Sequence, residues 1–173
     1  MIYIVEGPRN TGKSYLINSL SNNYKKHKLK YIDFYNNFYP NKEISWGFSC
    51  GKDLMFLSLV ENNLIDNIIL DRGFLSSVIY SILDKRINEE IGNYYIEYLK
   101  NQYEKIFDNF KIIFVSGKNQ NGRIKDYWDD YYKYEDEIFL YKKYINLFNN
   151  KIIINFENEF SEKSIESFNK IFI

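Results

Sequence analysis

The stretch from Gly7 to Ser14, GPRNTGKS, combines the residue types and the spacing of a phosphate-binding loop. Its two glycines permit backbone angles that a side chain forbids, so the loop can turn its N–H groups inward on an anion. Lys13 adds a movable cation for the β- and γ-phosphates, and Ser14 places a hydroxyl on Mg²⁺. The loop therefore predicts binding of the phosphates of a nucleotide together with Mg²⁺. The residues expected to contact the nucleotide are Gly7, Asn10, Thr11, Gly12, Lys13, Ser14 and Tyr15.

A carboxylate and a guanidinium follow one another at the end of the apolar run NIILD, residues 67–71. A continuous apolar run closed by an acid is typical of a buried parallel strand. Asp71 is then placed to orient the water shell of Mg²⁺ beside the loop, or alternatively to cap the helix expected from Phe74. Arg72 can grip an anionic acceptor with its planar fork. We favour the metal role for Asp71 because Arg72 follows it directly.

Strand and helix patterns alternate along the chain and must position these side chains. Apolar runs predict strands at 2–6, 30–34, 67–71, 111–115 and 151–155. Helical spacing follows the loop and recurs at 51–63, 74–82, 91–106, 130–147 and beyond Ser161. Residues 36–50 are expected to be irregular because they hold Pro40 and Gly47. The alternation predicts an α/β fold in which helices cover both faces of a mostly parallel sheet, as a single domain over 1–173.

The bulk composition restricts the class of protein. Lys plus Arg and Asp plus Glu both number 23, so the net charge is zero and the whole chain lacks a basic footprint for wrapping long nucleic acid. Cys50 is the only cysteine, which fits a reducing compartment. No apolar run approaches the roughly 20 residues that span a membrane. We expect a soluble cytoplasmic protein with no membrane partner. The joint excess of Asn, Ile, Lys, Tyr and Phe fits the AT-rich codon usage of a small viral genome.

Three segments together resemble the thymidylate kinase-like branch of nucleoside and nucleotide kinases. They are IVEGPRNTGKS, LDRGFLSSVIY and GRIKDYWDDYYKYEDEIFLYKKY, which are similar to that family's phosphate loop, Asp-Arg segment and lid with its following helix. The resemblance implies a P-loop NTPase fold with five parallel strands in the order 2-3-1-4-5, and transfer of the ATP γ-phosphoryl to a nucleoside or nucleotide. It also implies a mobile lid around 117–128, in which Arg123 and Lys125 close over the phosphates and exclude water.

The chain departs from the family pattern at two places that bear on the acceptor. Thymidylate kinases usually carry an acidic residue at the third position of the loop, where this chain has Arg9. Some members carry a loop Arg one position later, where this chain has Asn10. Arg9 can stabilise the transferring phosphoryl, contact an anionic acceptor or face solvent. The family's Arg-Pro-Glu type segment after the second strand is replaced by DFYNNFYP.

Asp33, in KYIDF, stands near the expected carboxyl end of the second strand, where ligands collect in an open parallel sheet. A hydroxyl acceptor must lose a proton on attack, so a carboxylate base would serve a nucleoside there, and deoxynucleoside kinases resemble this arrangement. A nucleotide acceptor already carries an oxyanion and needs only cations, which Arg9, Arg72 and Arg123 would supply. A strand-end hydrogen bond to a loop amide is the structural alternative for Asp33.

The leading expectation is a kinase that transfers the γ-phosphoryl to a deoxynucleoside monophosphate. The residues expected to carry the reaction are Lys13, Arg9, Asp33, Arg72 and Arg123. The first alternative is a kinase of a hydroxyl acceptor, either a deoxynucleoside or a hydroxymethylated base in DNA, as for some phage kinases of this kind. The second is an ATP-dependent switch protein with no acceptor. A homodimer through the apolar stripe 54–60 or the helix 74–83 is left open.

Overall fold

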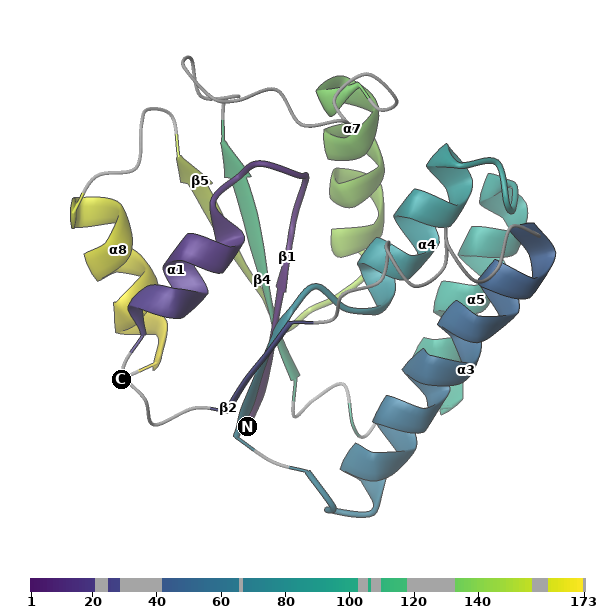
Figure 1. Ribbon diagram of the computed structural model, residues 1–173, viewed down its shortest axis with the longest axis horizontal. Coiled ribbons are helices and arrows are strands. Elements are labelled where there is room, and N and C mark those ends of the chain that lie inside the picture. Colours follow the sequence, from purple (N-terminus) through teal and green to yellow (C-terminus); the bar gives the residue numbers. More distant parts are fainter. Residues whose placement is uncertain are drawn as a thin grey trace.

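A single parallel sheet forms the centre of the molecule (Figure 1). The computed structural model describes residues 1–20, 25–28, 42–65, 67–102, 106, 110–117, 133–156 and 162–172. The strands of the sheet are β1 (Ile2–Glu6), β2 (Lys25–Lys28), β3 (Ile68–Asp71), β4 (Phe110–Gly117) and β5 (Lys151–Phe156). Their spatial order is β2-β3-β1-β4-β5. The α/β class and the parallel sheet are therefore confirmed.

β1 lies at the centre of the sheet and is buried along its whole length. It pairs in parallel with β3, where Ile2 lies opposite Ile68, and with β4, where Ile2 lies opposite Phe110. Successive side chains of a strand point to opposite faces, and β1 shows this directly. Ile2 and Ile4 enter one hydrophobic core, whereas Tyr3 and Val5 enter the other. The continuous apolar run of β1 thus reflects helices on both faces.

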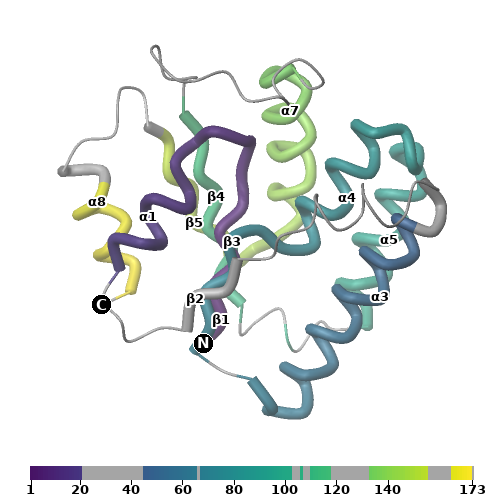
Figure 2. The backbone as a smooth tube through the Cα atoms, in the orientation of Figure 1, coloured from purple at the N-terminus to yellow at the C-terminus, as the bar shows by residue number. Residues whose placement is uncertain are grey.

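The helices divide unequally between the two faces (Figures 1 and 2). The larger core packs against α3 (Lys42–Glu61), α4 (Phe74–Leu83), α5 (Glu89–Gln102) and α7 (Tyr134–Ile145). The smaller core packs against α1 (Lys13–Ser19), α8 (Glu162–Asn169) and the short 3₁₀ helix η2 (Lys170–Phe172). Within the described part of the chain, no helix is long and apolar enough to cross a membrane.

The second strand was misplaced by the sequence pattern. KYIDF predicts a strand at 30–34, but the strand that pairs with β3 is Lys25–Lys28, with Lys25 opposite Ile68. An edge strand has only one neighbour, and lysines are common there because they discourage further pairing. Its apolar content is therefore a poor guide to its position. Residues 30–34 themselves lie outside the described residues, so the place of KYIDF stays a prediction.

The helix α3 is longer than the pattern predicts, because it begins at Lys42 within the segment expected to be irregular. Gly47 lies inside this helix, and a Cβ added there would meet no atom within 4 Å. Gly51 lies in the same helix, and each glycine in a helix interior costs about 1 kcal/mol relative to alanine. Packing of Trp46, Cys50 and Leu54 against the larger core offsets that cost.

A carboxyl group is buried where α3, α4 and α5 meet. Asp53 is 5% exposed and accepts long hydrogen bonds from Ser77 Oγ at 3.4 Å and Tyr95 OH at 3.5 Å. The ammonium of Lys52 lies 3.7 Å from its Oδ1. Burial is the main influence on both groups, and it raises the pKa of Asp53 to about 6 and lowers the pKa of Lys52 to about 8. The protonated form of Asp53 is therefore favoured by folding.

We expect this carboxyl to make stability fall as the pH rises. The folded chain holds the Asp53 proton up to a pKa of about 6, whereas the unfolded chain releases it near the ordinary aspartate pKa of 3.8. The free energy of unfolding should decrease over that window by about 3 kcal/mol from this group, at about 1.4 kcal/mol per pKa unit. Urea unfolding of Asp53→Asn and the parent chain at a series of pH values checks this. Parallel pH profiles for the two proteins would contradict it.

Candidate active site

The loop predicted to bind phosphate joins the centre of the sheet to α1 in a backbone conformation that requires glycine. Gly7 has φ +145°, and a Cβ added there would lie 2.0 Å from the carbonyl oxygen of Val115 in β4. Gly12 has φ +78° and is the N-cap of α1. Asn10, between them, is also in the left-handed region, at φ 67°. The loop therefore passes close against β4 and then turns sharply into the helix.

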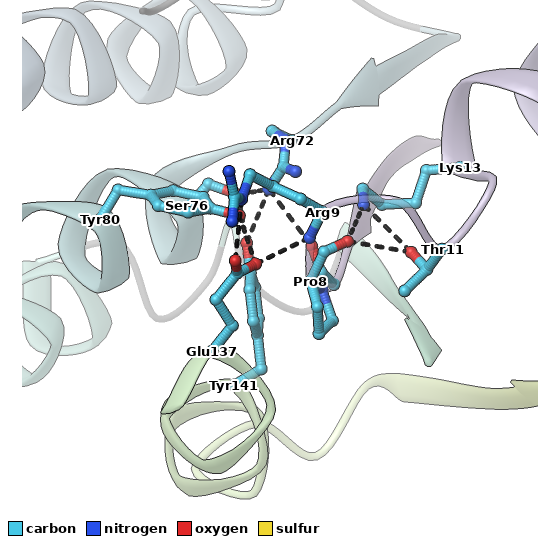
Figure 3. Close-up of polar contacts among 10 residues, drawn as sticks. Pro8, Arg9, Thr11, Lys13, Arg72, Ser76, Tyr80, Glu137 and Tyr141 are labelled. Atoms are coloured by element: carbon cyan, nitrogen blue, oxygen red, sulfur yellow. Dashed lines mark hydrogen bonds and ion pairs between the residues drawn. The ribbon is translucent and has the colours of Figure 1, made fainter. Parts of the chain in front are cut away.

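Lys13 is folded against its own loop (Figure 3). Its ammonium donates to the carbonyl oxygen of Pro8 at 2.5 Å and to Thr11 Oγ1 at 3.1 Å, and the side chain is 5% exposed. Thr11 Oγ1 in turn donates to the same Pro8 carbonyl at 3.0 Å. Burial and the neighbouring Arg72 hold the pKa of Lys13 well below its usual value. The ammonium can exchange these neutral acceptors for phosphate oxygens, which suit its charge better.

Ser14 and Asp71 meet across 57 residues of sequence. Ser14 Oγ donates to Asp71 Oδ2 at 2.5 Å, which places two hard oxygen atoms side by side at the ends of the loop and of β3. Mg²⁺ usually keeps several waters and takes one or two protein ligands besides phosphate oxygens, so this pair fits it. Among the described residues no group of three or more His, Cys, Asp or Glu side chains could form an all-protein metal site.

The helix that follows β3 is capped from β1, not by Asp71. The N-cap of α4 is Gly73, which has no side chain to offer. The carboxylate of Glu6 takes that role instead, accepting from Gly73 N at 2.8 Å and from Ser76 N at 3.4 Å and Ser76 Oγ at 2.5 Å. Glu6 is completely buried, and burial raises its pKa. The alternative role proposed for Asp71, as the helix cap, is therefore wrong.

Arg72 lies at the carboxyl end of β3 with its guanidinium held by three elements. Its Nη1 donates to the carbonyl oxygen of Gly7 at 3.2 Å, to Ser76 Oγ at 3.3 Å and to Tyr141 OH at 3.0 Å. The guanidinium carbon also stacks 5.0 Å from the centre of the Tyr80 ring. Burial acts to lower the pKa of Arg72, but the surrounding Tyr and carboxyl groups raise it overall, so its charge is secure.

Arg9 does not face solvent, contrary to one of the three interpretations of the sequence. Its backbone N–H donates to Glu137 Oε2 at 2.7 Å and its Nε donates to Glu137 Oε1 at 2.8 Å. Tyr80 OH donates to Glu137 Oε2 at 2.9 Å. Arg9 is 9% exposed and Glu137 is 1% exposed. Figure 3 shows the Arg9 side chain reaching from the loop toward Tyr80 and away from Lys13.

The described cations and carboxylates of the site are equal in number. Each cation has a carboxylate close to it: Arg9 has Glu137, Lys13 has Asp71 in its electrostatic surroundings, and Arg72 has Glu6. Three positive and three negative side chains therefore share the carboxyl ends of β1 and β3. Before any ligand binds, this part of the site is close to neutral.

Some predicted site residues are placed differently or lie outside the described chain. Tyr15 is 58% exposed on α1, so its ring is open to solvent. Asp33 and Arg123 lie outside the described residues, as does the predicted lid apart from Gly117. The residues that sequence reasoning missed are Glu6, Ser76, Tyr80, Glu137 and Tyr141. Their signal in the sequence was weak. Glu6 is an acid at the end of an apolar strand, and the other four are two pairs of polar residues, each pair four residues apart on a helix.

Comparison with known proteins identifies the fold. No protein-family model and no curated protein sequence matches the chain. Among solved structures, deoxyadenosine kinase from M. mycoides with bound dATP aligns over 100% of both chains with a TM-score of 0.59 and 19% identity. The same kinase with bound dCTP covers 99% of this chain and 98% of its own, with a TM-score of 0.55 and 19% identity. YorR protein from Bacillus subtilis, in complex with phosphorylated GDP, covers 99% of this chain and 93% of its own, with a TM-score of 0.59 and 15% identity.

The chain therefore shares the α/β fold of these solved structures over 99% to 100% of its length. The narrower resemblance to thymidylate kinases, and a phage origin, stay predictions.

We expect Gly7→Ala to be far more damaging than Gly47→Ala. The first substitution places a Cβ against the Val115 carbonyl in a backbone region that L-residues rarely adopt, whereas the second adds a Cβ in open space on a helix. Gly7→Ala should lower the free energy of unfolding by at least about 2 kcal/mol, and Gly47→Ala should raise it by up to about 1 kcal/mol. Urea unfolding measures both. Equal stability of the two variants would contradict the loop geometry.

Proposed function

We propose that the chain is an ATP-dependent phosphotransferase that transfers the γ-phosphoryl group to a hydroxyl of a deoxynucleoside. The observation that carries the choice of acceptor is the balance of charge at the carboxyl ends of β1 and β3, above all the Glu137 carboxylate bound to Arg9. In the reaction an acceptor oxygen bonds to the γ-phosphorus, the bond from that phosphorus to the β–γ bridging oxygen breaks, and the hydroxyl proton passes to a base.

The donor side of the site is built from the loop and the end of β3. Lys13 would leave Pro8 and Thr11 to bind the β- and γ-phosphates, while the loop N–H groups hold the β-phosphate. Ser14 and Asp71 are already in contact and would hold the metal ion or its water shell. Mg²⁺, when bound, would neutralise charge on the phosphate oxygens. This assignment agrees with the sequence prediction for ATP and Mg²⁺.

The acceptor side favours a neutral group. Two of the three arginines expected to attract an anionic acceptor are engaged within the protein, Arg9 by Glu137 and Arg72 by Gly7, Ser76 and Tyr141. A monophosphate would bring about two further negative charges beside the buried Glu137 carboxylate, and like charges in a partly buried site repel strongly. A sugar hydroxyl brings no such charge. The full-length likeness to a deoxyadenosine kinase supports the same acceptor class.

Three residues outside the described range complete the proposal. Asp33 is our candidate for the base that accepts the hydroxyl proton, since a hydroxyl acceptor needs one. Arg123, with Lys125, would close over the phosphates and exclude water from the reaction.

A deoxynucleoside monophosphate remains the second candidate acceptor. It is favoured by Arg72, which keeps its charge at the carboxyl end of β3 and is only partly buried. That is the thymidylate kinase-like activity that the sequence placed first. A hydroxymethylated base in DNA is a further candidate among hydroxyl acceptors. The remaining alternative is an ATP-dependent switch protein, which transfers the phosphoryl group to no acceptor.

We expect Lys13→Ala to remove transfer to every acceptor by at least about 100-fold, because the phosphates lose their movable cation. The circular dichroism spectrum should be unchanged. Lys142→Ala, on the exposed side of α7, is the matched control and should keep full activity. Transfer of labelled γ-phosphate from ATP–Mg²⁺ measures both. Unimpaired transfer by Lys13→Ala would overturn the assignment of the loop.

The acceptor is identified by offering the same label to deoxynucleosides, to their monophosphates, and to DNA with and without hydroxymethylated bases. We expect label in a deoxynucleoside monophosphate product, and severe loss of that transfer in Asp33→Asn. Label in a diphosphate, with Asp33→Asn nearly silent, would establish the second candidate instead. Label in the DNA would select the hydroxymethylated base, and ATP binding with no labelled product would favour the switch.

A further inference from the structure

We infer that Glu137 is a positioning residue that orients the guanidinium of Arg9 for phosphoryl transfer. The inference rests on the proposed phosphotransferase function and deepens it. Sequence reasoning singled out Arg9 as a cation for the transferring phosphoryl but gave no reason for its direction. The structure supplies one, because Arg9 is tied to a carboxylate 128 residues further along the chain.

The Glu137 carboxylate binds Arg9 at two positions, the backbone N–H and the side-chain Nε. One carboxylate oxygen accepts the backbone N–H of Arg9 at 2.7 Å and the other accepts its Nε at 2.8 Å. The first contact fixes the loop and the second fixes the side chain relative to the loop. Because the guanidinium is planar, a bond at Nε also sets the plane in which the two terminal nitrogens lie. Tyr80 OH holds the carboxylate itself, at 2.9 Å from Oε2.

The burial of this ion pair indicates more than a structural contact. Arg9 and Glu137 are 9% and 1% exposed, and removing two charges from water costs several kcal/mol per ion. A contact between apolar side chains would attach α7 to the loop without that cost. A charged pair is needed, however, if the loop must present a guanidinium whose orientation does not vary.

The helix α7 holds the two described arginines of the site, Arg9 and Arg72, from adjacent turns. Glu137 binds Arg9, and Tyr141, four residues later, accepts from Arg72 and contacts Ser76 Oγ at 2.7 Å. Residues four apart lie on the same side of a helix. One face of α7 therefore sets the positions of the two cations relative to each other. In Figure 3 Lys13 lies on one side of Arg9, and Tyr80 of α4 lies on the other side. The Arg9 guanidinium therefore occupies the side of the loop turned toward α4.

Under the proposed function the acceptor enters on that side of the loop, so the position of Arg9 predicts an effect on the chemical step. A cation beside the path of the phosphoryl stabilises charge that is redistributed in the transition state, which alters kcat more than the KM for ATP. Arg9→Ala should lower kcat by about 100- to 1,000-fold. Glu137→Gln keeps the shape and one acceptor oxygen but loses the charge, and should lower kcat by about 10-fold. The double variant should be no slower than Arg9→Ala alone, because the two residues act as a unit.

The decisive experiment combines these variants with chemical rescue, using labelled ATP and the acceptor that the parent protein phosphorylates. Free guanidinium should restore activity to Arg9→Ala while Glu137 is intact, and should fail in the double variant. Glu135→Gln, an exposed acid in the same first turn of α7, is the matched control and should behave as the parent. If Glu137→Gln does not fold, Tyr80→Phe loosens the carboxylate alone and should lower kcat by a few-fold, about 2 to 5.

The outcomes separate this inference from the proposed function. A parent protein that phosphorylates no acceptor contradicts the proposed function. A parent that is active, with losses that multiply in the double variant, or with guanidinium rescue that does not depend on Glu137, overturns the positioning role. Loss of thermal stability in Glu137→Gln with kcat unchanged would overturn it as well.

Discussion

The buried carboxylate of Glu6 is the contact on which the rest of the site depends. It ends the central strand β1, where water is excluded, and it accepts hydrogen bonds from the first turn of α4. A buried carboxylate is tolerated only when such donors satisfy it. Its bonds to Gly73 and Ser76 therefore fix where α4 begins, which in turn fixes the Arg72 that precedes it and the Tyr80 two turns into the helix. A single side chain thus joins the sheet to α4 and to the residues around Arg72.

Around that contact the protein pairs each cation with a carboxylate supplied by a different element. Arg9 of the loop meets Glu137 of α7. Asp71 at the end of β3 contacts Ser14 and influences Lys13, and Arg72 is influenced by Glu6. This arrangement keeps several charges buried without a large net charge. Under the proposed function it also disfavours an anionic acceptor, since every additional anion must compete with carboxylates already in place.

The parts of this structure that could be predicted are those with local signals. The glycine spacing of the loop, the strand ended by Asp71 and the alternation of elements depend on residues close in sequence, and the α/β fold follows from them. β2 was misplaced because an edge strand made of Lys25–Lys28 has little apolar pattern to detect. Glu137 was missed because its partner is 128 residues away, and a surface helix with acids in its first turn gives no sign that one of them is buried. Long-range pairing of charges is settled by topology, which single-sequence patterns do not contain.

The folded-back position of Lys13 has a consequence for how the loop meets its ligand. Its ammonium donates hydrogen bonds to neutral acceptors, and burial holds its pKa well below the usual value. A triphosphate would supply negative charge to that ammonium and raise the pKa again. The charged form of Lys13 and a bound phosphate would therefore stabilise each other.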